Sequence, residues 1–193
     1  MKTKLLCLIL VIASVTMSAE GHMTFKGVEL NGSLQEFVSK METQGFTLKK
    51  YLDTANGAIM KGSFMGYSNC EIYIYTTPNS KIVRLVKVYL PEQENNWYSL
   101  KSDYTNSVEA FTNKYGKPKD QVNFFSKPFD EGDGYEMTGV KSEKCNFISF
   151  WELDKGIIIV EITKWCQVSI GYADRINTDL MKQEKEQNTY NDI

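Results

Sequence analysis

Apolar residues recur every three or four positions in two stretches of the chain, and this spacing predicts two amphipathic helices. The first is expected over residues 33–44, where Ser33 and Glu36 form a capping box and Gly45 can end the helix. Its apolar face consists of Leu34, Phe37, Val38 and Met41. The second is expected over residues 98–115 and stops before Gly116. Its apolar face consists of Leu100, Tyr104, Val108, Phe111 and Tyr115.

Between and after these helices, apolar and polar residues alternate with the two-residue period of β-strands. Six strands are expected, over residues 58–67, 70–76, 81–90, 145–152, 156–163 and 165–172. Residues 24–30 and 121–125 are candidates for two more. Because short turns join consecutive strands, neighbouring strands should run antiparallel, and the predicted fold class is α+β.

A weak internal repeat divides the chain in two. The segment from Asn56 to Gly62 returns in degenerate form from Asp133 to Gly139, and the segment 70–75 resembles 145–150. Each copy follows one of the predicted helices. We therefore interpret the chain as two degenerate helix-plus-antiparallel-meander repeats packed together. Repeat one covers residues 20–92 and repeat two covers residues 97–173, and residues 174–193 form a short helix and a polar tail that frays.

Strand alternation separates two faces of the first predicted hairpin. If the hairpin closes through residues 77–80, Tyr73 pairs with Arg84 and Ile72 pairs with Leu85. The core face beneath the helix then consists of Ile72, Ile74, Val83 and Leu85, and the other face of Tyr73, Tyr75, Ile82 and Arg84. In repeat two, the face opposite the core consists of Ile148, Phe150, Ile157 and Ile159. Such an apolar second face is either covered inside the protein or used for binding. The candidate partner-binding residues are Tyr73, Tyr75 and Arg84.

The amino terminus has the pattern of a secretory signal peptide over residues 1–19. Lys2 and Lys4 precede an apolar run over residues 5–15, and small residues follow up to Ala19, the expected cleavage position, with Ser18 as the alternative. The run is too short for a lasting anchor, since a helix that spans a bilayer needs about 20 apolar residues. The mature protein is therefore expected to be exported, periplasmic or extracellular, with no stable membrane anchor.

Composition and charge exclude further classes of protein. Apolar residues make up 42% of the chain, which indicates a globular protein with a core. The net charge is −2, or −4 without Lys2 and Lys4, and no basic block occurs, so nucleic acid is not an expected partner. Cys70, Cys145 and Cys166 are expected to form no disulfide, with Cys70 to Cys145 as the alternative pairing.

No catalytic or cofactor-binding motif occurs in the sequence. The one histidine, His22, lies near the expected mature terminus and is interpreted as part of a frayed end, which disfavours Ser-His, Cys-His and zinc chemistry. The acidic residues Asp130, Glu131 and Asp133 are interpreted as a solvated turn. We predict no catalytic residue, no cofactor and no metal site, although a fold can still bring distant carboxylates together.

Several segments resemble a group of uncharacterised exported proteins from Bacteroides-type gut bacteria. The resemblance rests on residues 24–28 and 32–38, on Gly45-Phe46 and on Gly66-Tyr67-x-x-Cys70, and it covers most of the mature chain. It implies export and no particular reaction. In architecture alone, the tandem helix-plus-sheet units are similar to the β-lactamase inhibitor protein, which binds its enzyme through a concave sheet face, although each unit here has one clear helix instead of two.

One short motif predicts a covalent modification. The sequence Asp53-Thr54-Ala55 resembles the Asp-Ser/Thr-apolar motif at which Bacteroides-type bacteria attach O-glycans to exported proteins. Because it lies in an expected turn, Thr54 is a candidate O-glycosylation site.

The sequence favours a non-enzymatic, exported binding or inhibitor-like protein of the bacterial envelope that acts through a sheet face. Its partner could be a protein, a peptide or a glycan. Two alternatives stay open: a carboxylate-dependent hydrolase acting on glycans, which needs two acids about 5–10 Å apart, and an envelope assembly factor. An open aromatic sheet face would favour the binding protein, and converging buried carboxylates would favour the hydrolase.

Overall fold

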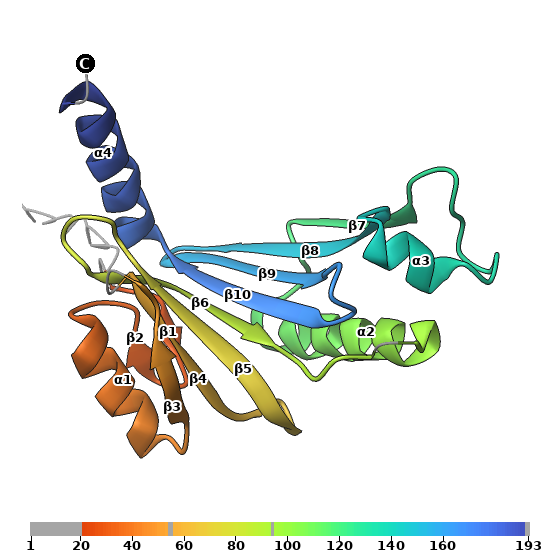
Figure 1. Ribbon diagram of the computed structural model, residues 1–193, viewed down its shortest axis with the longest axis horizontal. Coiled ribbons are helices and arrows are strands. Elements are labelled where there is room, and N and C mark those ends of the chain that lie inside the picture. The colour runs from red at the N-terminus through yellow and green to blue at the C-terminus, as the bar shows by residue number, and fades with distance from the viewer. Residues whose placement is uncertain (1–20, 54–55, 94, 192–193) are drawn as a thin grey trace, which may run out of the picture.

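One antiparallel sheet of eight strands organises the protein, with the strand order β3-β4-β5-β6-β10-β9-β8-β7 (Figure 1). It is seen in a computed structural model that describes residues 21–53, 56–93 and 95–191. The strands are β3 (Thr47–Tyr51), β4 (Gly57–Phe64), β5 (Tyr67–Thr76), β6 (Val83–Tyr89), β7 (Asp120–Phe125), β8 (Cys145–Leu153), β9 (Gly156–Ile162) and β10 (Val168–Asp174).

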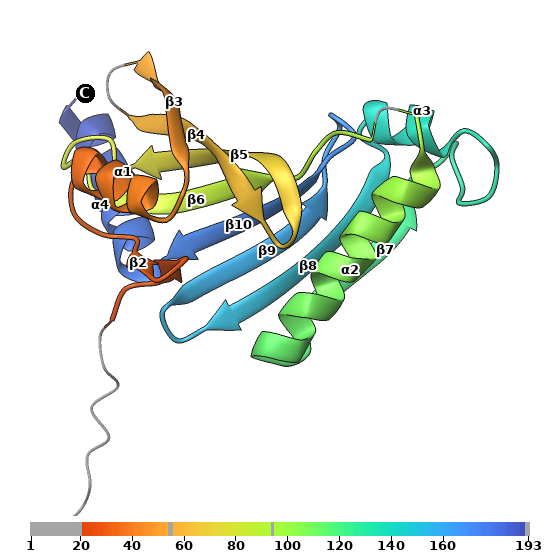
Figure 2. The same cartoon turned by 90° about the horizontal axis from the view of Figure 1, so that it is seen from below.

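The two halves of this sheet have the same order of elements. Helix α1 (Leu34–Thr43) precedes β3 to β6, and helix α2 (Trp97–Tyr115) precedes β7 to β10. The halves join edge to edge where β6 pairs with β10. Both helices therefore lie against the same face of one continuous sheet, as Figure 2 shows from below. The expected α+β fold of two helix-plus-antiparallel-meander units is confirmed.

Local capping chemistry sets where both helices begin. At α1, the Ser33 hydroxyl accepts a hydrogen bond from the Glu36 amide at 3.3 Å, and the Glu36 carboxylate accepts one from the Ser33 amide at 3.2 Å. This is the predicted capping box. Helix α2 begins one residue earlier than expected because the Asn96 side chain caps it, accepting from the Ser99 amide at 3.0 Å.

The core lies between these two helices and the sheet. Side chains of β5, β6, β9 and β10 that face the helices are fully buried; they include Ile72, Ile74, Val86, Val88, Val160 and Ile170. Trp151 on β8 is also buried, and its indole N–H donates to the carbonyl oxygen of Gly116 at 2.9 Å, which fastens the end of α2 to the sheet. Burial of this aliphatic layer is the main contribution to stability.

A separate small hairpin precedes α1. Its strands are β1 (Thr24–Phe25) and β2 (Val28–Glu29), so residues 24–30 do not add an edge strand to the main sheet. Phe25 is buried, and its ring centroid lies 5.2 Å from that of Tyr172 on β10 and 5.5 Å from that of Phe64 on β4. The hairpin therefore covers the core where the two halves meet.

The two halves share one order of helix and strands, but the residue-by-residue match predicted between them was wrong. Residues 56–62 enter β4, whereas residues 133–139 form a turn and the start of helix α3 (Glu136–Lys141). Residues 70–75 lie in β5 and 145–150 in β8, yet the strand that occupies the place of β5 in the second half is β9. Both α3 and the edge strand β3 were missed. The side chains of β3 are mostly exposed, so its sequence carries no clear alternation.

The carboxy-terminal segment is helical as far as Asn191, which corrects the expected fraying tail. Helix α4 (Arg175–Asn191) projects from the end of the sheet (Figure 1) and is anchored by polar side chains. The Asn177 amide donates to the carbonyl oxygens of Leu30 at 2.8 Å and Val83 at 3.0 Å. Apolar periodicity cannot reveal such an anchor.

A second polar anchor lies further along α4. The buried Glu184 carboxylate accepts hydrogen bonds from the backbone amides of Asn79 at 2.7 Å and Ser80 at 3.0 Å, in the turn between β5 and β6. Burial acts to raise the pKa of Glu184, but hydrogen bonding from the Ser80 side chain, from these two amides and from the Thr77 side chain outweighs it, and the net pKa lies below the ordinary value.

His22 does not belong to a frayed end, which is a further correction. Its Nδ1 atom lies 3.1 Å from a carboxylate oxygen of Asp174, at the end of β10. Asp174 is fully buried and also accepts from the amides of Met23 at 2.7 Å and Asn177 at 2.8 Å. This carboxylate therefore connects the first described residues with the start of α4.

The cysteines form no disulfide within the described ranges, as expected. Cys70 lies on β5 and Cys145 on β8, and three strands separate them, which corresponds to about 19 Å. The alternative pairing is therefore out of reach. Burial raises the pKa of Cys145 to about 12. In the described part of the chain, no helix combines the length and apolar character needed to span a bilayer.

Candidate functional site

No helix or strand of the described residues covers the sheet face opposite α1 and α2 over its central strands. The register aligns three rows of side chains across β5, β6, β10, β9 and β8, a width of about 19 Å. We call these side chains the open face. The rows are Tyr75, Leu85, Ala173, Ile157 and Glu152; Tyr73, Lys87, Gly171, Ile159 and Phe150; and Glu71, Tyr89, Ser169, Glu161 and Ile148.

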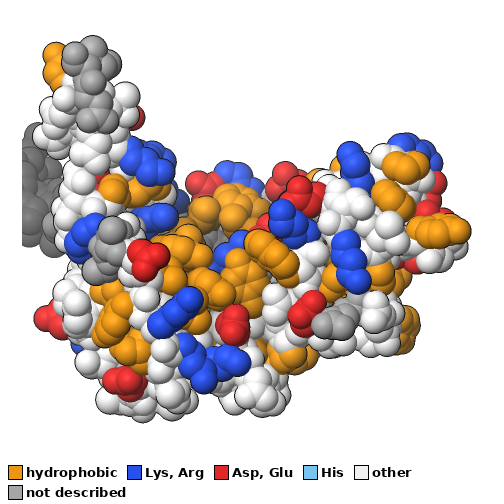
Figure 3. Space-filling view, in the orientation of Figure 1, with side chains coloured by type: hydrophobic (Ala, Val, Ile, Leu, Met, Phe, Trp, Pro, Cys, Tyr) orange, Lys and Arg blue, Asp and Glu red, His pale blue; other side chains and the backbone are white. Residues whose placement is uncertain are grey.

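This face is apolar at its centre and hollow in shape. Figure 3 shows hydrophobic side chains gathered in the hollow between α4 at one end and α3 at the other. Most of the side chains are half-buried, and Ile148 at the β8 side is 37% exposed. The two repeats do not cover each other's second face, because they meet edge to edge. The expected face of Ile148, Phe150, Ile157 and Ile159 opposite the core is observed.

The predicted pairing of β5 with β6 was wrong by three residues. Tyr73 lies opposite Lys87 instead of Arg84, because residues 77–82 form a longer loop in which the Thr77 amide donates to the Ile82 carbonyl at 2.8 Å. The register then shifts at Arg84, which is the extra residue of a β-bulge. Leu85 consequently lies on the open face instead of the core face, and Ile82 lies in the loop.

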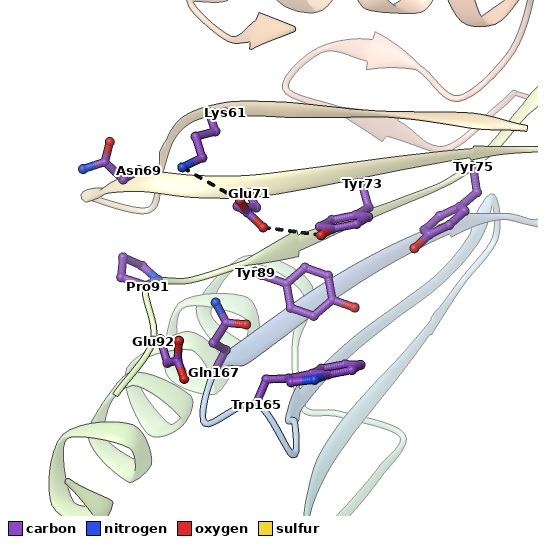
Figure 4. Close-up of a pocket in the computed structure, with 10 residues that line it drawn as sticks. All are labelled: Lys61, Asn69, Glu71, Tyr73, Tyr75, Tyr89, Pro91, Glu92, Trp165 and Gln167. Atoms are coloured by element: carbon purple, nitrogen blue, oxygen red, sulfur yellow. Dashed lines mark hydrogen bonds and ion pairs between the residues drawn. The ribbon is translucent and has the colours of Figure 1, made fainter. Parts of the chain in front are cut away.

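Four aromatic side chains form a continuous row on this face, and we call them the aromatic row: Tyr75, Tyr73, Tyr89 and Trp165. Ring centroids lie 6.4 Å apart between Tyr75 and Tyr73, 5.2 Å between Tyr73 and Tyr89, and 6.4 Å between Tyr89 and Trp165. In Figure 4 the Tyr89 ring lies between the rings of Tyr73 and Trp165, and both ring pairs are edge-to-face. Burial raises the pKa of Tyr73 and of Tyr75, so both hydroxyls stay protonated at neutral pH.

The aromatic row lines a cavity of about 570 Å³. Polar side chains form its rim, namely Lys61, Asn69, Glu71, Glu92 and Gln167 (Figure 4). Trp165, in the turn between β9 and β10, also lines a neighbouring cavity of about 350 Å³. Its indole is 57% exposed and stands between the two cavities. An exposed tryptophan in this position can insert into a partner and bury a large apolar surface.

An ion pair lies at the centre of the open face. The Lys87 ammonium donates to Glu161 at 2.6 Å, and the Ser169 hydroxyl donates to the same carboxylate at 3.0 Å. Burial acts to lower the pKa of Lys87, but the hydrogen bond and charge of Glu161 outweigh it, and the net pKa is raised. The pair therefore persists at neutral pH and presents fixed polar groups within an apolar surface.

Two carboxylates of the open face, Glu161 and Glu71, are held by polar contacts. Glu161 is bound to Lys87 and Ser169, while Glu71 lies 3.8 Å from the Lys61 ammonium and accepts from the Tyr73 hydroxyl at 3.4 Å. These contacts hold both side chains in structural roles. They supply no specific observation in favour of the hydrolase alternative.

The three predicted partner-binding residues lie close together on β5 and β6. Tyr73 and Tyr75 both line the larger cavity. Arg84 lies beside Tyr75, and its Nε donates to the carbonyl oxygen of Thr76 at 3.2 Å, while burial lowers its pKa. The prediction missed Tyr89 and Trp165. Alternation of Tyr89 with the core residues Val86 and Val88 could have indicated the former, but nothing local places Trp165 beside it.

Two other predicted sites, the cleavage position at Ala19 and the glycosylation site at Thr54, lie outside the described residues. Within the described ranges, no group of three or more His, Cys, Asp or Glu side chains is arranged to hold a metal ion. No known protein family, curated protein or solved structure matches the chain.

Proposed function

We propose that this protein is an exported, non-enzymatic binding protein that holds a polypeptide partner against the open face of its sheet. The observation that carries the proposal is the aromatic row, which lies uncovered on a face that continues into aliphatic side chains. Export is the expectation from the signal-like amino terminus.

The composition of the open face supports a polypeptide more than a glycan. Sugars stack on aromatic rings, and the aromatic row provides such a platform. The face also carries Leu85, Ile157 and Ile159, which are aliphatic side chains that match apolar side chains of a polypeptide. The central Lys87–Glu161 pair adds fixed charges that select the orientation of the partner.

The experiment uses the mature chain immobilised as a target for a phage-displayed random peptide library, with a glycan array in parallel. Trp165→Ala removes the exposed anchor. Gly171→Trp fills the hollow from its floor, because a side chain at Gly171 meets no atom within 4 Å at its Cβ. The matched control is Tyr98→Ala, which removes another aromatic side chain that is 83% exposed, on α2.

We expect the wild type and Tyr98→Ala to enrich the same peptides, and Trp165→Ala and Gly171→Trp to lose them. Enriched peptides should contain apolar anchors, as a desolvated aromatic centre requires. Glycan binding that Trp165→Ala abolishes would assign the face to glycans instead. Peptides that bind all four proteins equally would show that the open face is not the binding site.

A further inference from the structure

A second cavity, of about 290 Å³, lies on the helix-covered side of the sheet where the two repeats meet. Three segments form its walls: the β1–β2 hairpin, the β4–β5 turn and the last turns of α2, with Tyr172 of β10 behind them. No residue of the open face lines it. A ligand here would therefore be independent of the proposed partner.

The floor of this cavity is aromatic and apolar, while polar groups form the rest of its lining. The ring of Tyr172 lies 6.0 Å from that of Phe111 and 6.5 Å from that of Phe64, measured between centroids. Met65 and Ala110 add aliphatic surface. The apolar floor favours contact with a hydrocarbon over contact with water.

The mouth of the cavity is cationic. Lys26 and Lys114 line it, and none of the ten lining residues is acidic. Neither lysine forms an ion pair with a carboxylate of the described residues, so no neighbouring acid neutralises the charge at the mouth. The Lys114 ammonium instead lies 5.0 Å from the centroid of the Tyr115 ring. Two cations without carboxylate partners beside an apolar cavity attract an anion with an apolar tail.

Two strained turns hold side chains at this cavity. Lys26 and Met65 each occupy the first position of a two-residue hairpin turn, with φ of 51° and 52°, and each is followed by a glycine with positive φ. Asparagine or glycine is preferred at such a position, because other side chains cost about 1 kcal/mol or more in left-handed backbone. Both unfavourable residues lie in the same cavity wall, which places a cation and a flexible apolar side chain there.

From these observations we infer that the cavity binds the monoanion of a medium-chain fatty acid. The acyl chain lies along the floor that Met65 and Ala110 form with the accessible edges of Phe64, Phe111 and Tyr172, and the carboxylate lies at the mouth between Lys26 and Lys114. A two-chain phospholipid does not fit, because about 290 Å³ is at the lower limit of ordinary small-molecule sites.

The first test is titration calorimetry of the mature chain with octanoate, octanol and octylamine, which share one chain length and differ in charge. We expect octanoate to bind about tenfold more tightly than octanol, because its carboxylate gains two partly screened charge contacts, with Lys26 and Lys114. Octylamine should bind least, because its ammonium is repelled by the same two lysines. Equal affinities for all three ligands, or no heat with octanoate, would overturn the inference. Binding only to phosphatidylglycerol vesicles would overturn the choice of a soluble acid.

Variants then locate the binding site. The double variant Lys26→Gln/Lys114→Gln should reduce octanoate affinity to that of octanol, and Ala110→Phe, at an exposed helix position on the cavity wall, should abolish binding of both ligands. Gly171→Trp, which fills the open face, should leave octanoate binding unchanged. If Ala110→Phe folds normally by circular dichroism and still binds octanoate, the ligand lies elsewhere and the inference fails.

Discussion

The two faces of the single sheet differ in how deeply their side chains are buried. On the covered face, side chains such as Ile72, Val88 and Val160 are fully buried beneath α1 and α2. On the open face, their alternating neighbours Tyr73, Lys87 and Ile159 are only half-buried. Alternate residues of one strand therefore lie on opposite faces. One set packs in the core and stabilises the fold, and the other set forms the open face. Substitutions on the open face should therefore cost less stability than substitutions on the covered face.

Glycines show the same contrast at the level of single atoms. A Cβ at Gly62 would lie 2.3 Å from the ring of Phe46, which is buried beside α1, whereas a Cβ at Gly171 would meet nothing within 4 Å. At Gly62 the covered face thus has no space for a methyl group, whereas at Gly171 the open face has space for a larger side chain. An unfilled hollow on a rigid, packed scaffold is what the proposed function requires of the open face.

The largest expected difference between the faces concerns adjacent residues of β5. Ile72→Ala should lower the free energy of unfolding by about 2–5 kcal/mol, because it leaves a cavity in the core. Tyr73→Ala should lower it by about 0.5–1.5 kcal/mol, the scale of the aromatic contacts it loses. Urea denaturation of both variants measures the difference. Equal losses would mean that the open face is internal packing, and the proposed function would lose its basis.

The anchorage of α4, which borders the open face, should show the next largest effect. Asn177→Ala removes the donor to two buried carbonyl oxygens, so we expect a loss of about 1–3 kcal/mol in the free energy of unfolding. Hydrogen exchange should show increased opening of α4. Asn188→Ala is the control, since its side chain pairs with Asn79 at the exposed surface and should cost little. Equal effects of the two changes would contradict the proposed anchor.

The glycine pair predicts opposite signs for one substitution. Gly62→Ala should destabilise the protein by about 1–3 kcal/mol through overpacking against Phe46. Gly171→Ala should stabilise it by about 0.5–1 kcal/mol, because alanine loses less backbone freedom on folding and meets no neighbour. Thermal unfolding of the two variants gives the comparison. Destabilisation by Gly171→Ala would show that the hollow is filled.

The smallest effect concerns pH and Glu184. Its folded pKa lies below the ordinary value of 4.5, so the stability it contributes is fully present above that pH and is lost as the pH falls through the folded pKa. The difference in unfolding midpoint between wild type and Glu184→Gln should therefore shrink on acidification from about pH 7 to about pH 3. A difference independent of pH would show that the carboxylate charge does not hold α4. The other carboxylates are present in both proteins, so their contribution cancels when wild type and Glu184→Gln are compared at each pH.

The sequence alone determined those elements that depend on interactions between residues close together in the chain. The capping box at Ser33, the apolar faces of both helices and the alternation of six strands follow from short-range spacing, and each is present within a few residues of its predicted place. Alternation also identified Tyr73 and Tyr75 as lying opposite the core. Period and capping depend on neighbours within a few positions, so no tertiary contact is needed to read them.

Only the tertiary structure decided how these elements combine. The register of β5 and β6 depends on the loop over residues 77–82 and the bulge at Arg84, and neither leaves a trace in apolar spacing. The edge-to-edge union of β6 with β10 leaves one face open and brings Trp165 next to Tyr89, although they are far apart in sequence. The position of α4 depends on buried polar contacts of Asn177 and Glu184, which hydrophobic patterns overlook. Long-range pairing and buried polar geometry are set by the whole fold, so they lie beyond local sequence.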